Sequence, residues 1–250
     1  MELIAHRGAS FDAPENSLEA FDRAIAQGAT RLELDIQLTL DGVPVVNHDT
    51  TTDRTGDRAL AIEAVTLEEL RQVRLGNGEP IPTFAEVCEH IAGRAELDVE
   101  LKATAPRVAQ EILATMRAHN LLDQGLISSF DAEVLRVVRT SGYRGRTGLV
   151  VGSDSLNIRQ RVFEAWPFRA LDYAQANDLI IQHRLYHPLL KSGVRRRGGQ
   201  LLFWMSMEDE TQEPARRQKW YERIARIQPD GVILARCSEA QPFLSGDAVR

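Results

Sequence analysis

The sequence predicts a TIM-type (β/α)8 barrel, built as one domain over residues 1–250. Two observations support this fold class. Short apolar segments alternate with helical patterns from one end of the chain to the other, which is typical of repeated βα units around a parallel sheet. About eight of these segments have the character of strands, and eight strands close a barrel of this length.

The expected strands are short apolar runs, separated by polar and helical segments. They cover residues 3–5, 32–38, 97–101, 126–129, 148–151, 179–181, 201–204 and 231–234. Residues 170–174 also have an extended pattern and compete with 179–181 for the position of the sixth strand. Residues 43–46 can form a short additional strand.

Residues that favour helix ends lie between these strands. Ser17 can cap a helix whose apolar residues recur on one face. Thr66 and Thr83 each precede a glutamate by three residues, which is the spacing of a capping box. Pro106 and Pro214 suit the first position of two further helices. Each helix therefore has a start signal that agrees with the alternating pattern.

The regular alternation is interrupted between His48 and Thr83. This part of the chain contains a stretch rich in Thr, Asp, Arg and Gly, one expected helix and a Gly-Asn-Gly turn. We interpret residues 49–80, approximately, as a small insertion after the second strand. Such an insertion can lie over the site as a partial lid or beside it as an elaborate loop, and the sequence favours neither arrangement.

Composition limits the partners and the location of the protein. The chain carries 30 Lys and Arg against 36 Asp and Glu, a formal charge of -6, which argues against binding to a nucleic-acid backbone. No apolar run is long enough to cross a membrane, and the first residues lead into a polar motif without a signal-peptide core. We therefore expect a cytoplasmic protein without a nucleic-acid partner. Cys88 and Cys237 are expected to be buried, reduced thiols.

Polar and apolar residues alternate along the second and third strands, so the two sets face opposite sides of the sheet. The polar set, which a barrel would turn inward or toward its carboxyl-end rim, comprises Arg31, Glu33, Asp35, Gln37, Asp98, Glu100 and Lys102. Because neighbouring parallel strands lie under about 5 Å apart, carboxylates on their inward faces can converge on one ion. Glu33, Asp35 and Glu100 are the expected metal ligands.

An all-oxygen ligand set favours Mg2+, Ca2+ or Mn2+ over zinc. The competing interpretation is an antiparallel sheet with one solvated, charged face. Helical patterns follow most of the expected strands, and Asp41-Gly42 is the only obvious hairpin-like turn near the carboxylates. These two observations favour the barrel.

Two histidines lie close to the expected metal ligands in the sequence. His6 ends the first strand, and His48 lies just beyond the second, at positions from which barrel enzymes take their catalytic residues. Two imidazoles can divide the work of general base and general acid. Arg7 offers forked donors suited to a phosphate, and Lys102 offers a mobile point charge.

The remaining histidines and the longest basic run lack such neighbours. They are His90, His119, His183, His187 and Arg195-Arg196-Arg197. We expect structural roles for these histidines. The arginine run precedes the seventh strand, so it should form a solvated helix end on the opposite side of the barrel from the site.

The sequence resembles the glycerophosphodiester phosphodiesterase family. The matching segments follow the family's order along nearly the whole chain. They are His6-Arg7-Gly8, Pro14-Glu15-Asn16-Ser17, Glu33-Leu34-Asp35, Asp41-Gly42, His48-Asp49, Asp53-Arg54-Thr55, Ile81-Pro82-Thr83, Glu100-Leu101-Lys102, Ser129-Phe130, Trp204 and Asp230-Gly231. The resemblance implies a TIM-type barrel with a small insertion, and hydrolysis of a small glycerophosphodiester to an alcohol and sn-glycerol 3-phosphate.

The resemblance also implies roles for individual residues. The three carboxylates would bind one divalent cation, and His6 and His48 would form the acid/base pair. Arg7 and Lys102 would contact the phosphate, and Trp204 would line the glycerol side of the pocket. The nucleophile is either water or the substrate's own glycerol hydroxyl, which would give a cyclic phosphate intermediate.

This chain departs from the family pattern at a few positions. The departures are Ser17 in place of threonine, Met205-Ser206-Met207 after the tryptophan, and Ala235-Arg236 in place of Thr-Asp. They leave the expected metal ligands and histidines unchanged. The alternative functions are a lysophospholipase D-like hydrolase on the same core, a barrel that binds a phosphorylated ligand without catalysis, and a metal-dependent aldolase or lyase. The sequence does not indicate an oligomeric state.

Overall fold

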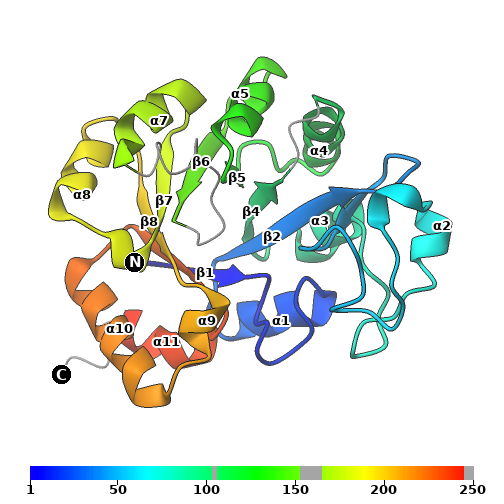
Figure 1. Ribbon diagram of the computed structural model, residues 1–250, viewed down its shortest axis with the longest axis horizontal. Helices are drawn as coiled ribbons and strands as arrows, with labels where there is room; N and C mark the ends of the chain where they lie inside the picture. The colour runs from blue at the N-terminus through cyan, green and yellow to red at the C-terminus, as the bar shows by residue number, and fades with distance from the viewer. Residues whose placement is uncertain (103–105, 153–164, 245–250) are drawn as a thin grey trace.

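The computed structural model describes residues 1–102, 106–152 and 165–244. In this part of the chain, eight parallel strands form a closed barrel with helices packed around its outside (Figure 1). The strand order is β1-β9-β8-β7-β6-β5-β4-β2, and pairing between β1 and β2 closes the ring. One further strand, β3, runs antiparallel to β2. The expected TIM-type barrel is confirmed.

All eight expected strands are present, each within two residues of its expected limits. They are β1 (Glu2–His6), β2 (Arg31–Leu38), β4 (Glu96–Leu101), β5 (Gly125–Ser129), β6 (Arg146–Val151), β7 (Asp178–Gln182), β8 (Leu201–Trp204) and β9 (Gly231–Leu234). The additional strand is β3 (Pro44–Val46). The competing position for the sixth strand, residues 170–174, is wrong, because these residues belong to α7 (Pro167–Ala174) and bury apolar side chains at helical spacing.

The other long helices lie between consecutive strands or, in the case of α11, after the last strand. They are α1 (Leu18–Ala26), α3 (Phe84–Ile91), α4 (Pro106–Ala118), α5 (Ala132–Thr140), α8 (Pro188–Arg195), α10 (Pro214–Ile227) and α11 (Cys237–Leu244). Short helical turns are α2 (Leu67–Leu70), α9 (Met207–Glu210), and the 3-10 turns η1 (Ile62–Ala64) and η2 (His183–Leu185). None of the described helices combines the length and apolar character that crossing a membrane requires.

The expected helix caps are also present. Ser17 Oγ accepts a hydrogen bond from the Ala20 backbone N–H, and Thr66 and Thr83 each form a capping box with the glutamate three residues on. At Thr83, the hydroxyl accepts from the Glu86 N–H at 3.2 Å while the Glu86 carboxylate accepts from the Thr83 N–H at 2.8 Å. These bonds satisfy donors that the first turn of a helix leaves free.

Replacing Thr83 with alanine is expected to lower the free energy of unfolding by about 1 kcal/mol, because the first turn of α3 loses its side-chain acceptor. Urea denaturation followed by circular dichroism measures this change. Thr83→Ser, which keeps the hydroxyl and removes only the methyl group, is the control and should lose less. Equal losses in the two variants would show that the methyl group, not the cap, matters.

Alternation along the strands divides the side chains between the outside and the inside of the barrel. On β2, Leu32, Leu34 and Ile36 are buried in the outer layer together with Phe21 of α1 and Phe84 of α3. This layer between strands and helices is the main hydrophobic core. The apolar face of β2 therefore packs on the helices, as expected, and the polar face turns inward.

The inside of the barrel has a polar side and an apolar side. The apolar side comes from β1 and from β5 to β9, and consists of Ile4, Leu126, Val150, Ile180, Leu202 and Ile233. The polar side comes from β2 and β4, where Arg31, Glu33, Asp35, Asp98 and Glu100 are all buried. Ions inside a protein need compensation, so this side is expected to be rich in ion pairs.

Residues 49–80 lie beside β2 and β3, on the right of Figure 1, and contribute to a small hydrophobic cluster of their own. Its buried members are Val45, Ile62, Leu70, Val73, Leu75 and Ile81. This cluster anchors the segment on β3, on the outer side of the barrel wall. We propose that residues 49–80 form one small accessory unit of the barrel domain.

The two cysteines and the arginine run at residues 195–197 lie where the sequence predicted. Cys88 and Cys237 are free and buried, as expected, and burial raises the pKa of each thiol to about 12. Arg195 is exposed at the end of α8, with its Nη2 3.1 Å from Asp230 Oδ1. Because Asp230 directly precedes β9, the arginine run lies at the amino-terminal end of the barrel, opposite the carboxyl ends of the strands.

Candidate active site

A cavity of about 540 Å3 opens at the carboxyl ends of the barrel strands. It is lined by seven of the eight residues selected from the sequence: His6, Arg7, Glu33, His48, Glu100, Lys102 and Trp204. The eighth, Asp35, lies behind this wall and is 1% exposed. Among the described residues, those that line the cavity include none of residues 49–80.

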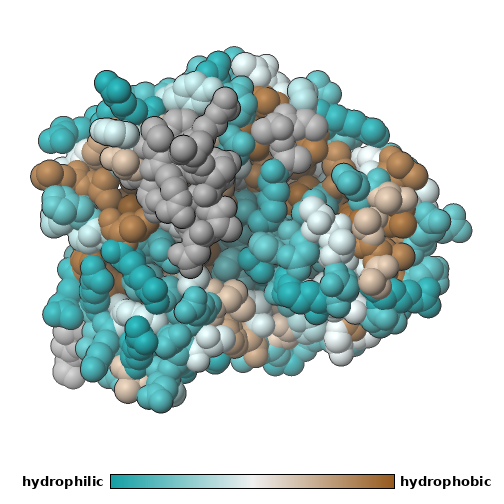
Figure 2. Space-filling view, viewed as in Figure 1, coloured by the Kyte–Doolittle hydropathy of each residue, from teal (hydrophilic) through white to brown (hydrophobic). Residues whose placement is uncertain are grey.

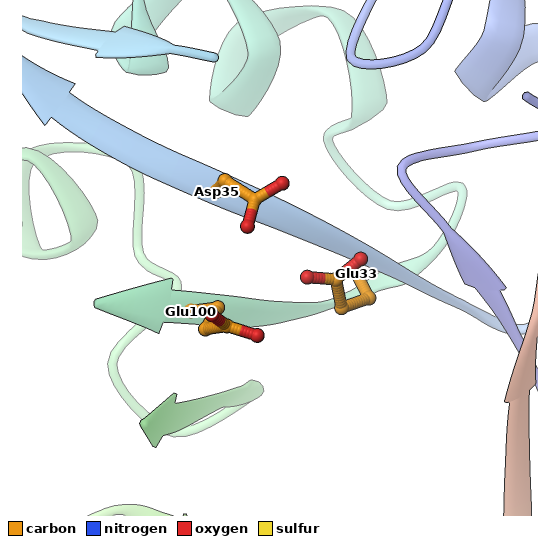
Figure 3. A group of neighbouring side chains, drawn as sticks. All are labelled: Glu33, Asp35 and Glu100. Carbon is orange, nitrogen blue, oxygen red and sulfur yellow. The ribbon is translucent and has the colours of Figure 1, made fainter. Parts of the chain in front are cut away.

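Three carboxylates meet on the polar side of the cavity. Glu33 and Asp35 point to the same face of β2, and the pairing of β2 with β4 aligns Asp35 with Glu100. One ligand atom from each residue lies within 4.8 Å of the others. Figure 3 shows the three side chains gathered between the two strands. The convergence expected from strand alternation is therefore present.

The three carboxyl groups differ in their electrostatic surroundings. Burial raises the pKa of Glu33 well above its ordinary value, and the negative charges of Asp35 and Glu100 raise it further. Burial also raises the pKa of Glu100. The pKa of Asp35 is lowered instead, because Lys102 and Arg7 outweigh the opposing effect of burial. The cluster therefore contains more potential negative charge than the protein alone neutralises.

This arrangement fits a divalent cation. Glu33 Oε1 is buried and has no hydrogen-bond partner among the described residues, which is costly for a carboxylate unless a cation lies nearby. The donors are all carboxylate oxygens, the ligand type preferred by hard cations such as Mg2+ and Ca2+. Glu33, Asp35 and Glu100 can therefore hold such an ion.

His6 and Arg7 are positioned by a sharp turn at the end of β1. The backbone at Arg7 and Gly8 has positive φ angles of 57° and 80°. A Cβ atom at Gly8 would lie 2.7 Å from the backbone carbonyl carbon of Ala20, so a side chain does not fit there. The turn leaves Arg7 Nε 3.2 Å from Asp35 Oδ2.

The surroundings of His6 disfavour the charged form of its imidazole. Burial lowers the pKa of His6 well below its ordinary value, and the neighbouring charge of Arg7 lowers it further. His6 Nε2 lies 4.0 Å from Glu33 Oε2, at the edge of the carboxylate cluster. A neutral imidazole in this position can accept a proton.

His48 follows β3, which pairs with β2 on the edge opposite β4, and it lines the cavity. Its Nδ1 lies 2.6 Å from Asp49 Oδ1, and its backbone oxygen accepts a hydrogen bond from Gln37 Nε2 at 3.1 Å. Because a carboxylate can only accept, this contact assigns the proton of the neutral ring to Nδ1. Nε2 is then the nitrogen with a free lone pair.

Lys102 lies between two of the carboxylates. Its Nζ is 2.8 Å from Glu100 Oε1 and 3.0 Å from Asp35 Oδ1. Burial opposes the ammonium charge, but these two carboxylates prevail and raise the pKa of Lys102. The cavity therefore keeps two cationic side chains, Arg7 and Lys102, beside its acidic cluster.

Known proteins of one family match the chain along nearly its whole length. A model of the glycerophosphoryl diester phosphodiesterase family matches residues 6–236. The chain belongs to this family. A glycerophosphodiester phosphodiesterase of Caldanaerobacter subterraneus subsp. tengcongensis is 31% identical over 247 residues, and the alignment covers 92% of each chain.

Solved structures agree with this membership. A phosphodiesterase of Oleispira antarctica, in complex with the product sn-glycerol-3-phosphate, is 26% identical with a TM-score of 0.81, over 98% of this chain and 97% of that one. A glycerophosphodiester phosphodiesterase of Agrobacterium tumefaciens is 24% identical with a TM-score of 0.82, over 98% of this chain and 100% of that one. At this lower identity the likeness shows the fold alone.

Two residues of the Pro14–Ser17 motif contact site residues, and the sequence did not predict these contacts. Asn16, which has a positive φ of 58°, donates from Nδ2 to Asp35 Oδ2 at 3.1 Å. Glu15 Oε1 lies 3.1 Å from Arg7 Nη1. In the sequence, only the match to a family motif indicated that these residues have a function. The fold shows that the loop before α1 packs against the carboxylates.

Asp98 is another cavity residue for which the sequence suggested no chemical role. It is fully buried, and its neighbour in the pairing of β2 with β4 is Glu33. Ser128 Oγ donates to Asp98 Oδ1 at 2.6 Å, whereas burial raises the pKa of Asp98 to about 7. The alternation of polar and apolar residues along β4 indicated that the Asp98 side chain points inward. How far Asp98 lies below the carboxylate cluster depends on the register between β2 and β4, which the sequence does not show.

The wall opposite the carboxylates is apolar. Trp204 donates its indole N–H to the Val151 carbonyl at 2.9 Å, so its ring serves as an apolar surface. Phe130 packs edge-on against this ring, with centroids 5.9 Å apart. Of the residues that depart from the family pattern here, Met205 is buried in the outer core and Met207 lines the cavity.

Hydrogen bonds to a buried glutamate of α9 hold the loop after β9. Glu210 of α9 is fully buried and accepts hydrogen bonds from the backbone N–H groups of Ala235 and Arg236. The guanidinium of Arg236 lies over the ring of Phe11, 3.7 Å from its centroid. These departures from the family pattern therefore have structural partners outside the cavity. The four other histidines, His90, His119, His183 and His187, do not line it.

Proposed function

We propose that this member of the phosphodiesterase family hydrolyses glycerophosphodiesters to an alcohol and sn-glycerol 3-phosphate. The observation that carries this proposal is the grouping, at one cavity and directly behind its wall, of three convergent carboxylates with two histidines and two cationic side chains. The related enzyme from Oleispira antarctica, whose structure contains sn-glycerol-3-phosphate, supports the same class of substrate. We further propose that Glu33, Asp35 and Glu100 hold one divalent cation.

A phosphodiester resists attack because its negative charge repels a nucleophile. In the proposed reaction, Arg7 and Lys102 contact the phosphate and stabilise the charge on its oxygens. The cation, when bound, adds Lewis-acid stabilisation of the same oxygens. The apolar wall at Trp204 excludes water from the glycerol carbons, and so orients the substrate with its phosphate toward β2 and β4.

Proton transfer is assigned to the two imidazoles. One takes a proton from the nucleophile as the new bond to phosphorus forms. The other gives a proton to the departing alcohol oxygen as the old bond breaks. The imidazole that takes a proton must enter the step neutral, and the one that gives a proton must enter it protonated. The lowered pKa of His6 and the unprotonated Nε2 of a neutral His48 are each compatible with the accepting role. The nucleophile is either water or the glycerol hydroxyl of the substrate.

The proposal predicts release of sn-glycerol 3-phosphate from glycerophosphocholine. An assay linked to glycerol-3-phosphate dehydrogenase measures this product in the presence of Mg2+, Ca2+ or Mn2+. Phosphorus NMR of the reaction mixture would reveal a cyclic phosphate if the glycerol hydroxyl is the nucleophile. Absence of product with all three cations would contradict the proposal, and binding of glycerol phosphate without turnover would favour a non-catalytic barrel.

A lysophospholipase D-like activity is the second candidate, and one observation favours it. Large apolar side chains are exposed on the connections after β6 and β7: Trp166 is 59% exposed, Leu185 39% and Leu189 67%. Figure 2 shows hydrophobic side chains over α8, at the left edge of a largely hydrophilic face. In the same assay, a higher kcat/KM for lysophosphatidylcholine than for glycerophosphocholine would identify the lysophospholipid as the preferred substrate.

A further inference from the structure

Three family motifs contain charged residues to which the proposed function gives no role. These residues are Glu15, Asp49 and Arg54. Glu15 belongs to the loop before α1, whereas Asp49 and Arg54 belong to the segment after β3. None of the three lines the cavity. The fold nevertheless brings them into direct contact.

Arg54 joins the other two through all three of its guanidinium nitrogens. Its Nη1 and Nη2 lie 2.7 Å from the two oxygens of Glu15, in a forked arrangement. Its Nε lies 2.5 Å from Asp49 Oδ2. Charge-assisted bonds of this forked type fix orientation as well as distance. A lysine has one nitrogen and does not reproduce this pattern.

Each partner of Arg54 uses its other contacts to hold a cavity residue. Asp49 Oδ1 lies 2.6 Å from Nδ1 of His48. Glu15 Oε1 lies 3.1 Å from Nη1 of Arg7. Two short chains of contacts therefore lead from one guanidinium to the imidazole and to the guanidinium that face the cavity.

We propose that Arg54 is a positioning residue that orients both His48, through Asp49, and Arg7, through Glu15. The inference rests on the proposed function, in which these two residues act on the substrate. Arg54 keeps the carboxylates of Asp49 and Glu15 close to each other, although their like charges would otherwise separate them. It also shares the charge of Glu15, which would otherwise pair with Arg7 alone and weaken the attraction of Arg7 for a phosphate.

The kinetic test compares Arg54→Ala with a matched control, Arg71→Ala. Arg71 also ties the segment of residues 49–80 to the rest of the protein, because its Nη2 lies 2.6 Å from Glu86 Oε1 of α3, but neither residue lines the cavity. We expect kcat/KM for glycerophosphocholine to fall about 10- to 100-fold in Arg54→Ala and to change less than about 2-fold in Arg71→Ala. Equal effects in the two variants would overturn the proposal.

A double-mutant cycle tests the connection through Asp49. If Arg54 acts on His48 through this carboxylate, kcat in the Arg54→Ala, Asp49→Asn double variant falls less than the product of the two single effects. Methylguanidinium, added below denaturing concentration, should restore part of the kcat of Arg54→Ala and none of that of Asp49→Asn. Fully multiplicative effects would show that Arg54 acts independently of Asp49.

A spectroscopic measurement separates this inference from the proposed function. In protein labelled with 15N-histidine, the His48 resonances, identified by their loss in His48→Ala, report which ring nitrogen carries the proton. We expect the Nδ1–H form in the wild type and in Arg71→Ala, and a mixture of forms in Arg54→Ala. An unchanged tautomer in Arg54→Ala would refute the inference even if the enzyme hydrolyses its substrate. If instead the tautomer changes in Arg54→Ala but the wild type does not hydrolyse the substrate, only the proposed function is refuted.

Discussion

Replacing either His6 or His48 with alanine is expected to lower kcat for glycerophosphocholine by about 10²- to 10⁴-fold, the usual contribution of general acid–base catalysis. Each variant loses one proton-transfer group while the carboxylate cluster and the cationic side chains remain. Steady-state kinetics at saturating cation measures the effect. His90→Ala is the control, because His90 pairs with Asp22 at 2.9 Å and does not line the cavity. Near-normal turnover in either cavity variant would remove that histidine from the proposed mechanism.

A substrate with a good leaving group can separate the two roles. A nitrophenolate leaves without needing a proton, so the variant that lacks the general acid should hydrolyse a nitrophenyl phosphodiester almost as fast as the wild type does. The variant that lacks the general base should remain slow on both substrates. If both variants are equally slow on the activated diester, the two histidines do not divide the work between base and acid.

Removing divalent cations with a chelator is expected to abolish activity, and adding Mg2+, Ca2+ or Mn2+ back should restore it. The reason is that the carboxylate cluster presents buried negative charge, and Glu33 Oε1 has no hydrogen-bond partner within the described part of the chain. In Glu33→Gln, which removes one charged ligand, added cation should restore little activity. Full activity of the chelated wild type would show that Glu33, Asp35 and Glu100 do not have the proposed role.

The same cluster predicts how the stability of the cation-free protein depends on pH. Burial raises the pKa of Glu33 well above its ordinary value and that of Asp98 to about 7. Above the ordinary carboxyl range, the folded state therefore binds more protons than the unfolded state. Its stability is highest below that range and falls as pH rises through the folded pKa values. His6 acts in the opposite sense at lower pH, because its pKa is lowered.

Cation binding displaces the proton of Glu33, so the affinity for the cation should rise with pH. Thermal unfolding at about pH 5 and about pH 8, with and without Mg2+, measures both effects. The increase in Tm caused by Mg2+ should be larger at the higher pH. A cation-induced shift that is equal at both pH values, or absent, would contradict this account of Glu33.

The parts of the site that could be predicted from the sequence are those set by strand periodicity. Glu33 and Asp35 stand two residues apart on β2, so they share a face in any strand. Glu100 joins them because parallel neighbours in a barrel have adjacent inward faces, and the pairing of Asp35 with Glu100 confirms this expectation. For the same reason, the eight strands could be located within two residues.

The contacts made by loops could not be predicted, because they depend on backbone geometry rather than on period. Arg7 and Asn16 adopt positive φ angles, a conformation that is uncommon for residues other than glycine and that local pattern does not indicate. These turns bring Glu15 to Arg7 and to Arg54, 39 positions away in the sequence. The extended pattern of residues 170–174 was misleading because a short apolar run fits a strand or a helix equally well.

The unequal division of the barrel interior has a consequence for how such an enzyme can be redesigned. Val150, Ile180 and Ile233 line the cavity from the apolar side and belong to a cluster separate from the main core. None of them takes part in the ion pairs that support the carboxylates. Under the proposed function, substitutions of similar volume at these positions are expected to change the shape of the apolar wall and to leave the ion pairs of the carboxylates in place. If the proposed function is correct, substrate preference can change through β6, β7 and β9 without altering the carboxylates of β2 and β4.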